Sequence, residues 1–368
     1  MPKLRLAVFF GGRSGEHEIS LMSARSVLGA LDRGKYEVYQ VGITHAGSWL
    51  SGEDVLGGFE REDFEGLQPV TILPGPGGPG LYARGKSGVL EEITPLDLAF
   101  PVLHGSFGED GTIQGLFEMA DLPYVGAGVL ASAVAMDKGL FKEVMQSRGI
   151  PVLEGLVLNT TELETDLDRA LERAESVAGY PLFIKPANLG SSVGISKVRS
   201  RSDLMEGLME AAQYDRRVLV ERGIEAREIE VSVLGNEEPE ASVPGEIVPS
   251  DEFYSYRAKY LDNRSELHIP APIDEQTTEE ARRISIEAYQ AIDGAGMARV
   301  DLLLDKATGR LYLNEINTIP GFTRISMYPK LLEASGISYP ELMDRLIELA
   351  QARHAQKQKL VRSYEGAA

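Results

Sequence analysis

An acidic residue and an amide stand two positions apart at the end of an apolar alternating segment. Glu315 and Asn317 follow Leu311 and Leu313, and a Pro-Gly pair then ends the segment in a turn. Side chains two positions apart share one face of a strand, so we expect these four residues to lie on one side. Hard cations such as Mg²⁺ take oxygen ligands, commonly one or two carboxylates together with substrate phosphates. The pattern therefore indicates a metal site at the end of a strand.

A second carboxylate, Asp301, lies upstream in the apolar segment 298–304, on the same expected face as Arg299. The intervening residues 305–310 predict a hairpin turn. If residue 305 pairs with residue 311, Asp301 lies opposite Glu315 and Arg299 lies opposite Asn317. Like charges placed directly opposite weaken a sheet, and a bound cation would compensate for them. The alternative is a surface hairpin whose charged face lies in water.

Composition limits the class of protein. The chain has 368 residues, of which 43% are hydrophobic, which suggests two or three domains. The absence of cysteine excludes a disulfide framework, a thiolate zinc site and a cysteine nucleophile, and it fits a reducing compartment. The net charge of −19 argues against broad nucleic-acid binding. The first residues have no signal-peptide pattern and no apolar run approaches ~20 residues, so we expect a soluble cytoplasmic protein that does not enter a membrane.

The N-terminal segment predicts a strand over residues 4–10, a glycine turn and a helix over 19–31, as in the first unit of a doubly wound sheet. The G-x-G-x-x-G fingerprint of dinucleotide-binding folds is absent. Glu16 follows the turn, near the carboxyl end of the strand, where a carboxylate could hold an ammonium group. The alternative is an acidic residue that is favoured at a helix start by the helix dipole.

A second buried strand, 96–103, runs into a glycine-rich turn that carries His104 and Glu109. A histidine in such a turn can be structural as well as catalytic. Another strand is expected at 36–43, and the acidic, Gly/Pro-rich region 51–92 is expected to be a surface excursion. Its residues 80–87 match the letters of a P-loop, but no buried strand precedes them and no helix follows, which indicates a chance match.

A possible anion site follows. Asp137 caps a helix expected over 138–148, which begins with Lys138. A strand over 180–186 carries Lys185 and leads into the Gly/Ser loop 188–195. The backbone N–H groups of such a loop can form a nest for an anion, and the two lysines are candidate phosphate partners.

Two further strands, 217–221 and 228–233, carry Glu221 and Glu228. Both glutamates can accept hydrogen bonds from an adenine amino group and ribose hydroxyls, or they can be surface acids. The aromatic and basic segment 253–260 is typical of a loop that closes over a site, although an ordinary packed loop is the alternative. Helices are expected over 278–293 and 340–358, and the last residues are expected to fray.

These segments, taken in order along the chain, resemble the D-alanine–D-alanine ligases of the ATP-grasp superfamily. The resemblance rests on residues 10–20, 104–111, 136–138, 185–194, 299–301 and 314–321. It implies an α/β N-terminal domain plus α+β ATP-grasp domains, with ATP held between two antiparallel sheets. The implied ranges are 1–135 for the N-terminal substrate domain, 136–224 for the central lobe, and 225–368 for the C-terminal domain with the metal site and a lid loop at 250–262.

The resemblance also implies roles for individual residues. Two Mg²⁺ or Mn²⁺ ions would be held by Asp301, Glu315 and Asn317. ATP would meet Lys138, Lys185, Ser191, Ser192, Glu221, the backbone of Val220, Glu228 and Lys259. The D-alanine substrates would meet Glu16, His104, Arg299, Gly321, Ser326 and Met327. The residues closest to the chemistry would be Glu16, Ser191, Arg299, Gly321 and Tyr260, with Arg299 and the Gly321 N–H group as the oxyanion site and Tyr260 in the lid.

The implied reaction joins two D-alanine molecules, with ATP converted to ADP and phosphate through a D-alanyl phosphate, for peptidoglycan precursor synthesis. Related ligases that make D-alanyl-D-lactate carry a histidine in the lid, so Tyr260 favours D-alanine as the second substrate, and the apolar Met327 argues against D-serine. A ligase for D-lactate or D-serine stays open as an alternative, as do a silent nucleotide-binding regulator and a nicotinamide oxidoreductase. The resemblance further implies a homodimer whose small-molecule partners are D-alanine and ATP, with no nucleic-acid partner.

Overall fold

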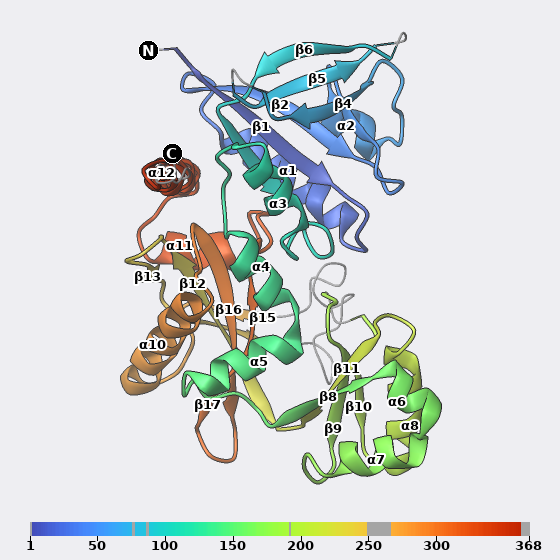
Figure 1. The fold of residues 1–368 in the computed structure, drawn as a ribbon. Coiled ribbons are helices and arrows are strands. Elements are labelled where there is room, and N and C mark those ends of the chain that lie inside the picture. The colour runs from blue at the N-terminus through green and yellow to red at the C-terminus, as the bar shows by residue number, and fades with distance from the viewer. Residues whose placement is uncertain (1, 76–77, 86–87, 191–192, 249–265, 362–368) are drawn as a thin grey trace, which may run out of the picture.

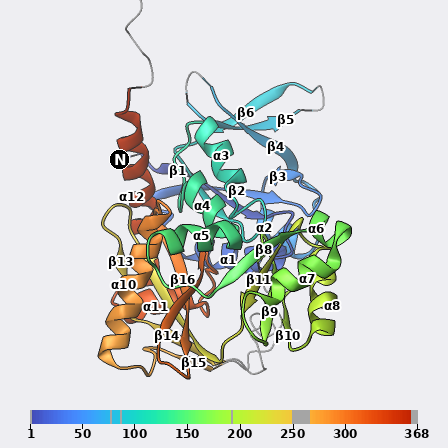
Figure 2. The same ribbon diagram turned by 60° about the horizontal axis from the view of Figure 1, so that its bottom comes forward.

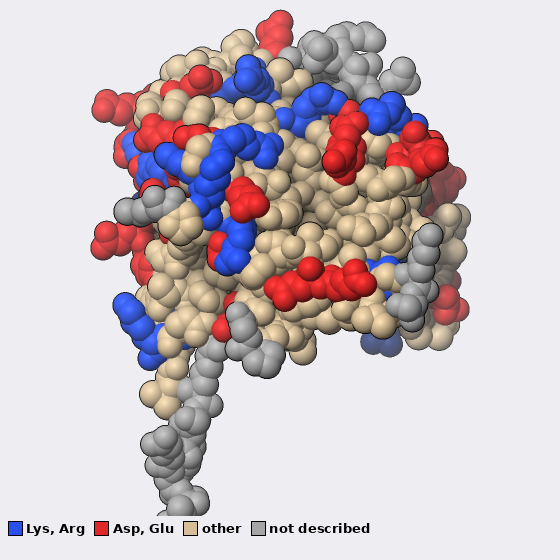
Figure 3. Space-filling model, turned by 90° about the horizontal axis from the view of Figure 1, so that it is seen from above, with Lys and Arg blue, Asp and Glu red and all other residues tan. Residues whose placement is uncertain are grey.

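The computed structural model describes residues 2–75, 78–85, 88–190, 193–248 and 266–361. Three sheets organise this part of the chain: a seven-stranded N-terminal sheet, a four-stranded central sheet and a six-stranded C-terminal sheet (Figure 1). Among the described residues, no helix is both long and apolar enough to cross a membrane. On the face seen in Figure 3, acidic and basic side chains are intermixed rather than separated into regions of one sign.

The N-terminal sheet has the strand order β6-β5-β4-β3-β2-β1-β7. Strand β1 is parallel to both of its neighbours and lies buried among apolar side chains, as the continuous apolar run predicts. The carboxyl ends of β1 and β7 therefore bring the turns after them to one edge of the sheet. The elements are β1 (Leu4–Gly11), α1 (His17–Ala30), β2 (Tyr36–Ile43), β3 (Trp49–Ser51), α2 (Val55–Glu60), β4 (Gln68–Leu73), β5 (Gly80–Arg84), β6 (Leu90–Pro95), β7 (Leu98–Val102) and α3 (Thr112–Met119).

The expectation that residues 51–92 form a surface excursion is wrong. This region contributes strands β4, β5 and β6, which extend the N-terminal sheet by antiparallel pairing. Val70, Ile72 and Leu81 are buried in the same cluster as Phe9 of β1. The Gly/Pro-rich turns obscured short strands whose inward positions are apolar. The P-loop letters begin on β5, an antiparallel hairpin strand, which confirms that the match is a coincidence.

The central sheet has the order β10-β9-β11-β8 and is antiparallel throughout. One face packs its apolar side chains, including Ile184 and Val220, against helices α7 and α8. Lys185 and Glu221 alternate with these residues, so they lie on the opposite face. The elements are β8 (Gly155–Asn159), α6 (Thr160–Thr165), α7 (Leu167–Glu175), β9 (Leu182–Pro186), β10 (Ser196–Val198), α8 (Arg201–Ala211) and β11 (Arg217–Arg222).

The C-terminal sheet has the order β15-β14-β12-β16-β17, with β13 paired to β12. Its core includes side chains of α5 and α10, so α5 packs on this sheet although it precedes the central sheet in sequence. The elements are β12 (Ala226–Leu234), β13 (Glu240–Ala241), β14 (Gly245–Val248), β15 (Glu266–His268), α10 (Glu275–Ala291), β16 (Met297–Asp305), β17 (Leu311–Asn317), α11 (Met327–Ala334) and α12 (Tyr339–Gln358), preceded by α4 (Val129–Met136) and α5 (Lys138–Ser147).

The last helix, α12, returns to the N-terminal sheet. It contacts α1 and β7, and its buried side chains, such as Leu346, share one cluster with Leu6 and Phe100. Figure 2 shows this helix running past the C-terminal sheet and alongside the N-terminal strands. Helix α12 is thus packed against the N-terminal sheet, which fixes the position of the segment between β17 and α12.

Candidate active site

The hairpin of β16 and β17 places Asp301 opposite Glu315 and Arg299 opposite Asn317, as predicted. The register near the turn differs from the expected one, because Leu304 pairs with Leu311. A shift of one residue between Asp301 and Leu302 restores the expected pairing at the strand end.

The shift leaves Asn314 as the extra residue of a β-bulge. The expectation that Leu311 and Leu313 share a face of the strand with Glu315 is therefore wrong. They are buried in the C-terminal core together with Ile316, whereas Asn314 and Glu315 both line a cleft on the other side. Strict alternation from Leu311 would have turned Glu315 into the core.

The oxygen atoms at this strand end suit a hard cation. Asp301 accepts hydrogen bonds from Arg299 Nε at 2.7 Å and Nη2 at 2.6 Å, and from Asn317 Nδ2 at 3.0 Å. Among the described residues no group of three His, Cys, Asp or Glu side chains is placed to hold a metal. Two carboxylates and an amide fit Mg²⁺, which completes its shell with water and substrate phosphates.

Glu230 of β12 is a member of this charge cluster that the sequence analysis missed. It pairs in register with Asp301, is 4% exposed and lies 3.1 Å from Arg299 Nε. Arg299 thus lies between the carboxylates of Glu230 and Asp301, which holds its guanidinium at the strand end. The alternating sequence of β12 was the available signal, because it gives Glu230 the same face as Glu228.

A buried trio of charges joins two residues of the central sheet, Lys185 and Glu221, to Lys142 of helix α5. Glu221 is 1% exposed and accepts a hydrogen bond from Lys185 Nζ at 2.6 Å, and its other oxygen pairs with Lys142. Burial alone would raise the pKa of Glu221, but the ammonium groups of Lys142 and Lys185 outweigh it and lower the pKa to about 2. Two lysine side chains thus share one carboxylate at the wall of the cleft, and burial lowers the pKa of the Lys142 ammonium group.

Lys142 is the second residue that sequence reasoning missed. It belongs to α5, one turn after Lys138, and lies between Phe141 and Met145 on the helix face that is buried. A lysine on the apolar face of a helix was the signal that a buried anion faces it. Lys138 itself donates to the Leu189 carbonyl at 2.7 Å and lies 3.6 Å from Glu315.

The cleft between the two sheets measures about 470 Å³, a size typical of small-molecule sites. The sequence-predicted residues brought together in it are Lys138, Lys185, Glu221, Glu228, Asp301 and Glu315. The side chain of Val220 packs in the core of the central sheet. Ser191, Ser192, Lys259 and Tyr260, with the lid loop 250–262, lie outside the described residues.

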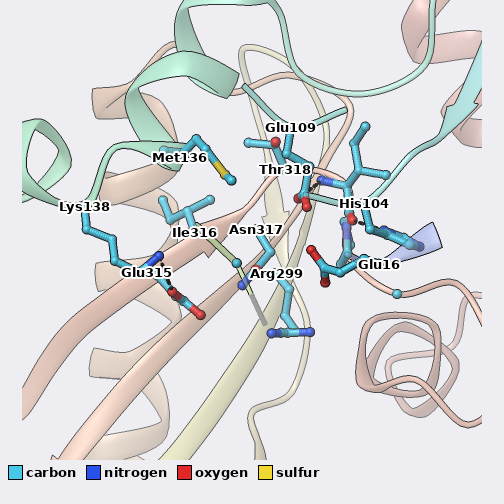
Figure 4. Close-up of a pocket in the computed structure, with 15 residues that line it drawn as sticks. Glu16, His104, Glu109, Met136, Lys138, Arg299, Glu315, Ile316, Asn317 and Thr318 are labelled. Carbon is cyan, nitrogen blue, oxygen red and sulfur yellow. Dashed lines mark hydrogen bonds and ion pairs between the residues drawn. The ribbon is translucent and has the colours of Figure 1, made fainter. Parts of the chain in front are cut away.

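A second cavity adjoins the cleft and is lined by Glu16, His104, Arg299, Asn317 and Gly321 (Figure 4). Glu16 projects into it from the turn after β1. A Cβ atom on Gly105 would lie 2.4 Å from Glu16 Oε2, and one on Gly190 would lie 3.0 Å away. Glycines of the N-terminal and central domains therefore approach this carboxylate more closely than any other residue could.

Glu109 and His104 lie behind this cavity. Glu109 accepts hydrogen bonds from the N–H groups of Gly105 and Ile319, both at 2.8 Å. Burial and the charge of Glu16 raise the pKa of Glu109 to about 8. Burial lowers the pKa of His104, whose Nδ1 lies 2.8 Å from the Ile319 carbonyl. Both residues contact the loop that follows β17, which the sequence analysis did not foresee.

Gly321 and Ser326 lie close together in that loop. A Cβ atom on Gly321 would lie 2.9 Å from Ser326 Oγ, which also contacts Thr323 Oγ1 at 2.7 Å. Met327 is 5% exposed and packs with Ile247 and Leu331. The structure thus brings Gly321 to the cavity and Ser326 beside it, whereas Met327 belongs to a small apolar cluster.

A cleft between two antiparallel sheets, with lysines on one wall and an acidic strand end on the other, is typical of ligases of the ATP-grasp class. The family model described as "D-ala D-ala ligase C-terminus" matches residues 144–348, and the one described as "D-ala D-ala ligase N-terminus" matches residues 5–127. The chain belongs to the D-alanine–D-alanine ligase family. This membership replaces the alternative of a nicotinamide oxidoreductase.

Individual relatives agree with the family models. The D-alanine–D-alanine ligase of Thermoanaerobacter sp. (strain X514) is 53% identical over 97% of this chain and 99% of its own, and that of Heliobacterium modesticaldum is 51% identical over 98% of both chains. The solved D-alanine-D-alanine ligase of Coxiella burnetii matches with a TM-score of 0.84 and 38% identity over 99% of both chains. The VanG D-Ala:D-Ser ligase of Enterococcus faecalis also gives a TM-score of 0.84, at 34% identity over 95% of this chain and all of its own.

Proposed function

We propose that this enzyme joins two D-alanine molecules into D-alanyl-D-alanine for peptidoglycan precursor synthesis, with ATP converted to ADP and phosphate through a D-alanyl phosphate. The observation that carries this proposal is the junction of the two cavities. Lys138, Gly190 and Glu315 line both the nucleotide-sized cleft and the cavity beside Glu16. A γ-phosphate at this junction would lie next to an amino-acid carboxylate held in the second cavity.

The cleft supplies the groups for phosphoryl transfer. The transferred phosphoryl group carries negative charge on its oxygens, so catalysis depends on positioning and charge stabilisation. Lys138, Lys185 and the N–H groups of the glycine loop, with Ser191 and Ser192, would contact the phosphates. Glu221 and Glu228 would accept hydrogen bonds from the adenine amino group and the ribose, and the backbone of Val220 would meet the adenine edge.

Asp301, Glu315 and Asn317 would hold two Mg²⁺ or Mn²⁺ ions. Such ions neutralise phosphate charge when they are bound. The arrangement of the protein groups supports this assignment, because Asp301 and Glu315 are opposed on adjacent strands and both carboxylates line the cleft. The pairing of Asp301 with Arg299 holds one carboxylate in a defined orientation.

The second cavity supplies the groups for peptide-bond formation. Glu16 would hold the ammonium group of the first D-alanine, and Ser326 would contact the carboxylate of the second. A tetrahedral intermediate carries an oxyanion, which preorganised donors stabilise. Arg299 and the Gly321 N–H group would supply these donors. Within the described part of the chain no protein group accepts a hydrogen bond from this N–H.

The lid loop 250–262 would close over both cavities, with Lys259 reaching a phosphate and Tyr260 excluding water from the acyl phosphate. Tyr260 would also favour D-alanine over D-lactate as the second substrate. We further propose that the enzyme is a cytoplasmic homodimer. These assignments rest on the sequence resemblance alone.

The direct test is phosphate release from ATP in the presence of D-alanine, with the dipeptide identified by mass and chirality and with L-alanine as the control substrate. We expect release that depends on D-alanine and a D,D-dipeptide product. Release that is absent, or equal without an amino acid, would support a silent nucleotide-binding regulator. Mixtures of D-alanine with D-serine or D-lactate test the second substrate, and a predominant mixed product at neutral pH would overturn the choice of D-alanine.

A further inference from the structure

The loop after β17 is fastened by side chains of the N-terminal domain on both sides of Gly321. Ile319 N donates to Glu109 Oε1 at 2.8 Å, and the Ile319 carbonyl lies 2.8 Å from His104 Nδ1. On the far side, Phe322 N donates to Ser23 Oγ at 3.2 Å. Ser23 belongs to α1, 299 positions away from Phe322. These contacts of Glu109, His104 and Ser23 form a frame around the loop, and Gly321, between the two fastened residues, lines the cavity.

The hydroxyl of Ser23 joins two of these contacts. It lies 2.9 Å from His104 Nε2 and also accepts from Phe322 N. A carbonyl oxygen can only accept, so His104 Nδ1 carries the proton that it donates to Ile319. In a neutral imidazole Nε2 is then an acceptor, which the Ser23 O–H satisfies. Each donor and acceptor of this group of contacts is used once. A neutral imidazole is also what burial favours, because burial lowers the pKa of His104.

Further contacts hold the far side of the loop rigidly. The Phe322 carbonyl accepts from the Tyr339 hydroxyl, and the fully buried Phe322 ring packs against the rings of Phe100 and Tyr328. Ser23 is itself fully buried on a helix face that carries Ala24 and Val27. A buried hydroxyl on an apolar face is costly unless its hydrogen bonds are made, so its position depends on the loop that it holds.

We propose that Ser23 is a positioning residue, which acts through His104 and the Phe322 backbone to hold the Gly321 N–H group in place beside Arg299. This inference rests on the proposed function, in which Gly321 N–H and Arg299 receive the oxyanion. His104 is then a link in the frame, since both of its ring nitrogens have protein partners and binding substrate through either one would break a contact.

The test compares Ser23→Ala and Ser23→Cys with Ser242→Ala. The hydroxyl of Ser242 is equally buried, accepts from Ser232 N at 3.0 Å and donates to the Val243 carbonyl at 2.8 Å, so it is matched in the hydrogen bonds lost. We expect kcat for dipeptide formation to fall by about 10- to 10²-fold in Ser23→Ala, with the KM for ATP unchanged, because a small misplacement suffices for such losses. Ser23→Cys keeps a weak hydrogen-bond donor, so its kcat should lie between those of Ser23→Ala and the wild type. Ser242→Ala should lose thermal stability to a similar extent and keep the wild-type kcat.

Amide hydrogen exchange supplies a measurement that does not depend on activity. We expect the amides of Ile319 and Phe322 to exchange slowly in the wild type and much faster in Ser23→Ala, with no change in Ser242→Ala. Fast exchange in the wild type, or an unchanged kcat in a folded Ser23→Ala variant, would overturn the proposal. If the wild type releases no phosphate with D-alanine, the proposed function fails instead, and the exchange result still decides whether Ser23 holds the loop.

Discussion

Asp301 and Glu315 face each other across the β16–β17 ladder, one residue out of step with the pairing at the hairpin turn. The bulge at Asn314 makes this possible, because it lets Leu313 point into the core while Glu315 points into the cleft. The strand therefore serves two purposes with a single irregular residue. Its apolar half belongs to the C-terminal core, and its polar half belongs to the candidate metal site.

Glu315→Gln tests the metal assignment. We expect turnover to fall by at least about 10²-fold, since charge neutralisation at the phosphates is lost. Folding should persist, because the change also removes the repulsion with Asp301 across the ladder. The measurements are ATP turnover at several Mg²⁺ concentrations and thermal unfolding, with Glu287→Gln on the exposed side of α10 as the control. Turnover near the wild-type value would remove Glu315 from the metal site.

Arg299→Lys tests the oxyanion assignment. The guanidinium holds Asp301 through two hydrogen bonds and also contacts Glu230, and a lysine cannot reproduce this fork. We expect kcat to fall by about 10²-fold while the KM for ATP changes little. The exposed Arg283→Lys, on α10, is a matched control. A selective rise in the KM for ATP would instead place Arg299 on the nucleotide side.

The Lys142–Glu221–Lys185 trio predicts how stability depends on pH. Because the pKa of Glu221 is lowered from 4.5 to about 2, its contribution to the free energy of unfolding is complete above about pH 4.5 and is lost as the pH falls towards 2. Lys142→Met removes one of the two ammonium groups, so we expect acid unfolding to begin at a higher pH. Circular dichroism across this range checks the shift.

Lys357→Met is the control for that experiment, because Lys357 forms an exposed ion pair with Glu118. Surface pairs contribute little to stability, so its acid transition should stay close to that of the wild type. Equal shifts in the two variants would show that burial of the trio does not matter.

Gly321→Ala tests the proposed oxyanion role of the loop after β17 directly. The new methyl group would lie 2.9 Å from Ser326 Oγ, so the serine or the loop must move. We expect kcat to fall by about tenfold or more, because both the N–H donor and the second-substrate contact are displaced. Gly29→Ala, at an exposed position of α1 with no atom nearby, is the control and should keep full activity. An unchanged kcat in Gly321→Ala would argue against a precise role for this N–H group.

The sequence allowed prediction of the features that depend on neighbouring residues. The acidic hairpin, the cap at Asp137 and the parallel start of the N-terminal sheet all follow from local patterns. The ordered resemblance supplied the two antiparallel sheets that face each other across a cleft, which the structure shows.

Features that depend on distant contacts were missed. Lys142, Glu230 and Ser23 owe their interest to partners on other elements, and no local pattern names those partners. The bulge at Asn314 was hidden for the same reason, since it becomes visible only when both strands are paired. The strands within residues 51–92 were hidden by the glycines and prolines of their turns.

The fastening of the loop after β17 has a consequence for how the protein is made. Ser23, His104 and Glu109 are synthesised early, and the loop that they hold follows them in the chain by between 210 and 299 residues. Until then, the side chains of Ser23, His104 and Glu109 lack the backbone groups to which they hydrogen-bond. Nascent chains shorter than about residue 322 should therefore lack the loop after β17, and competence for ligation should be acquired only near the end of translation.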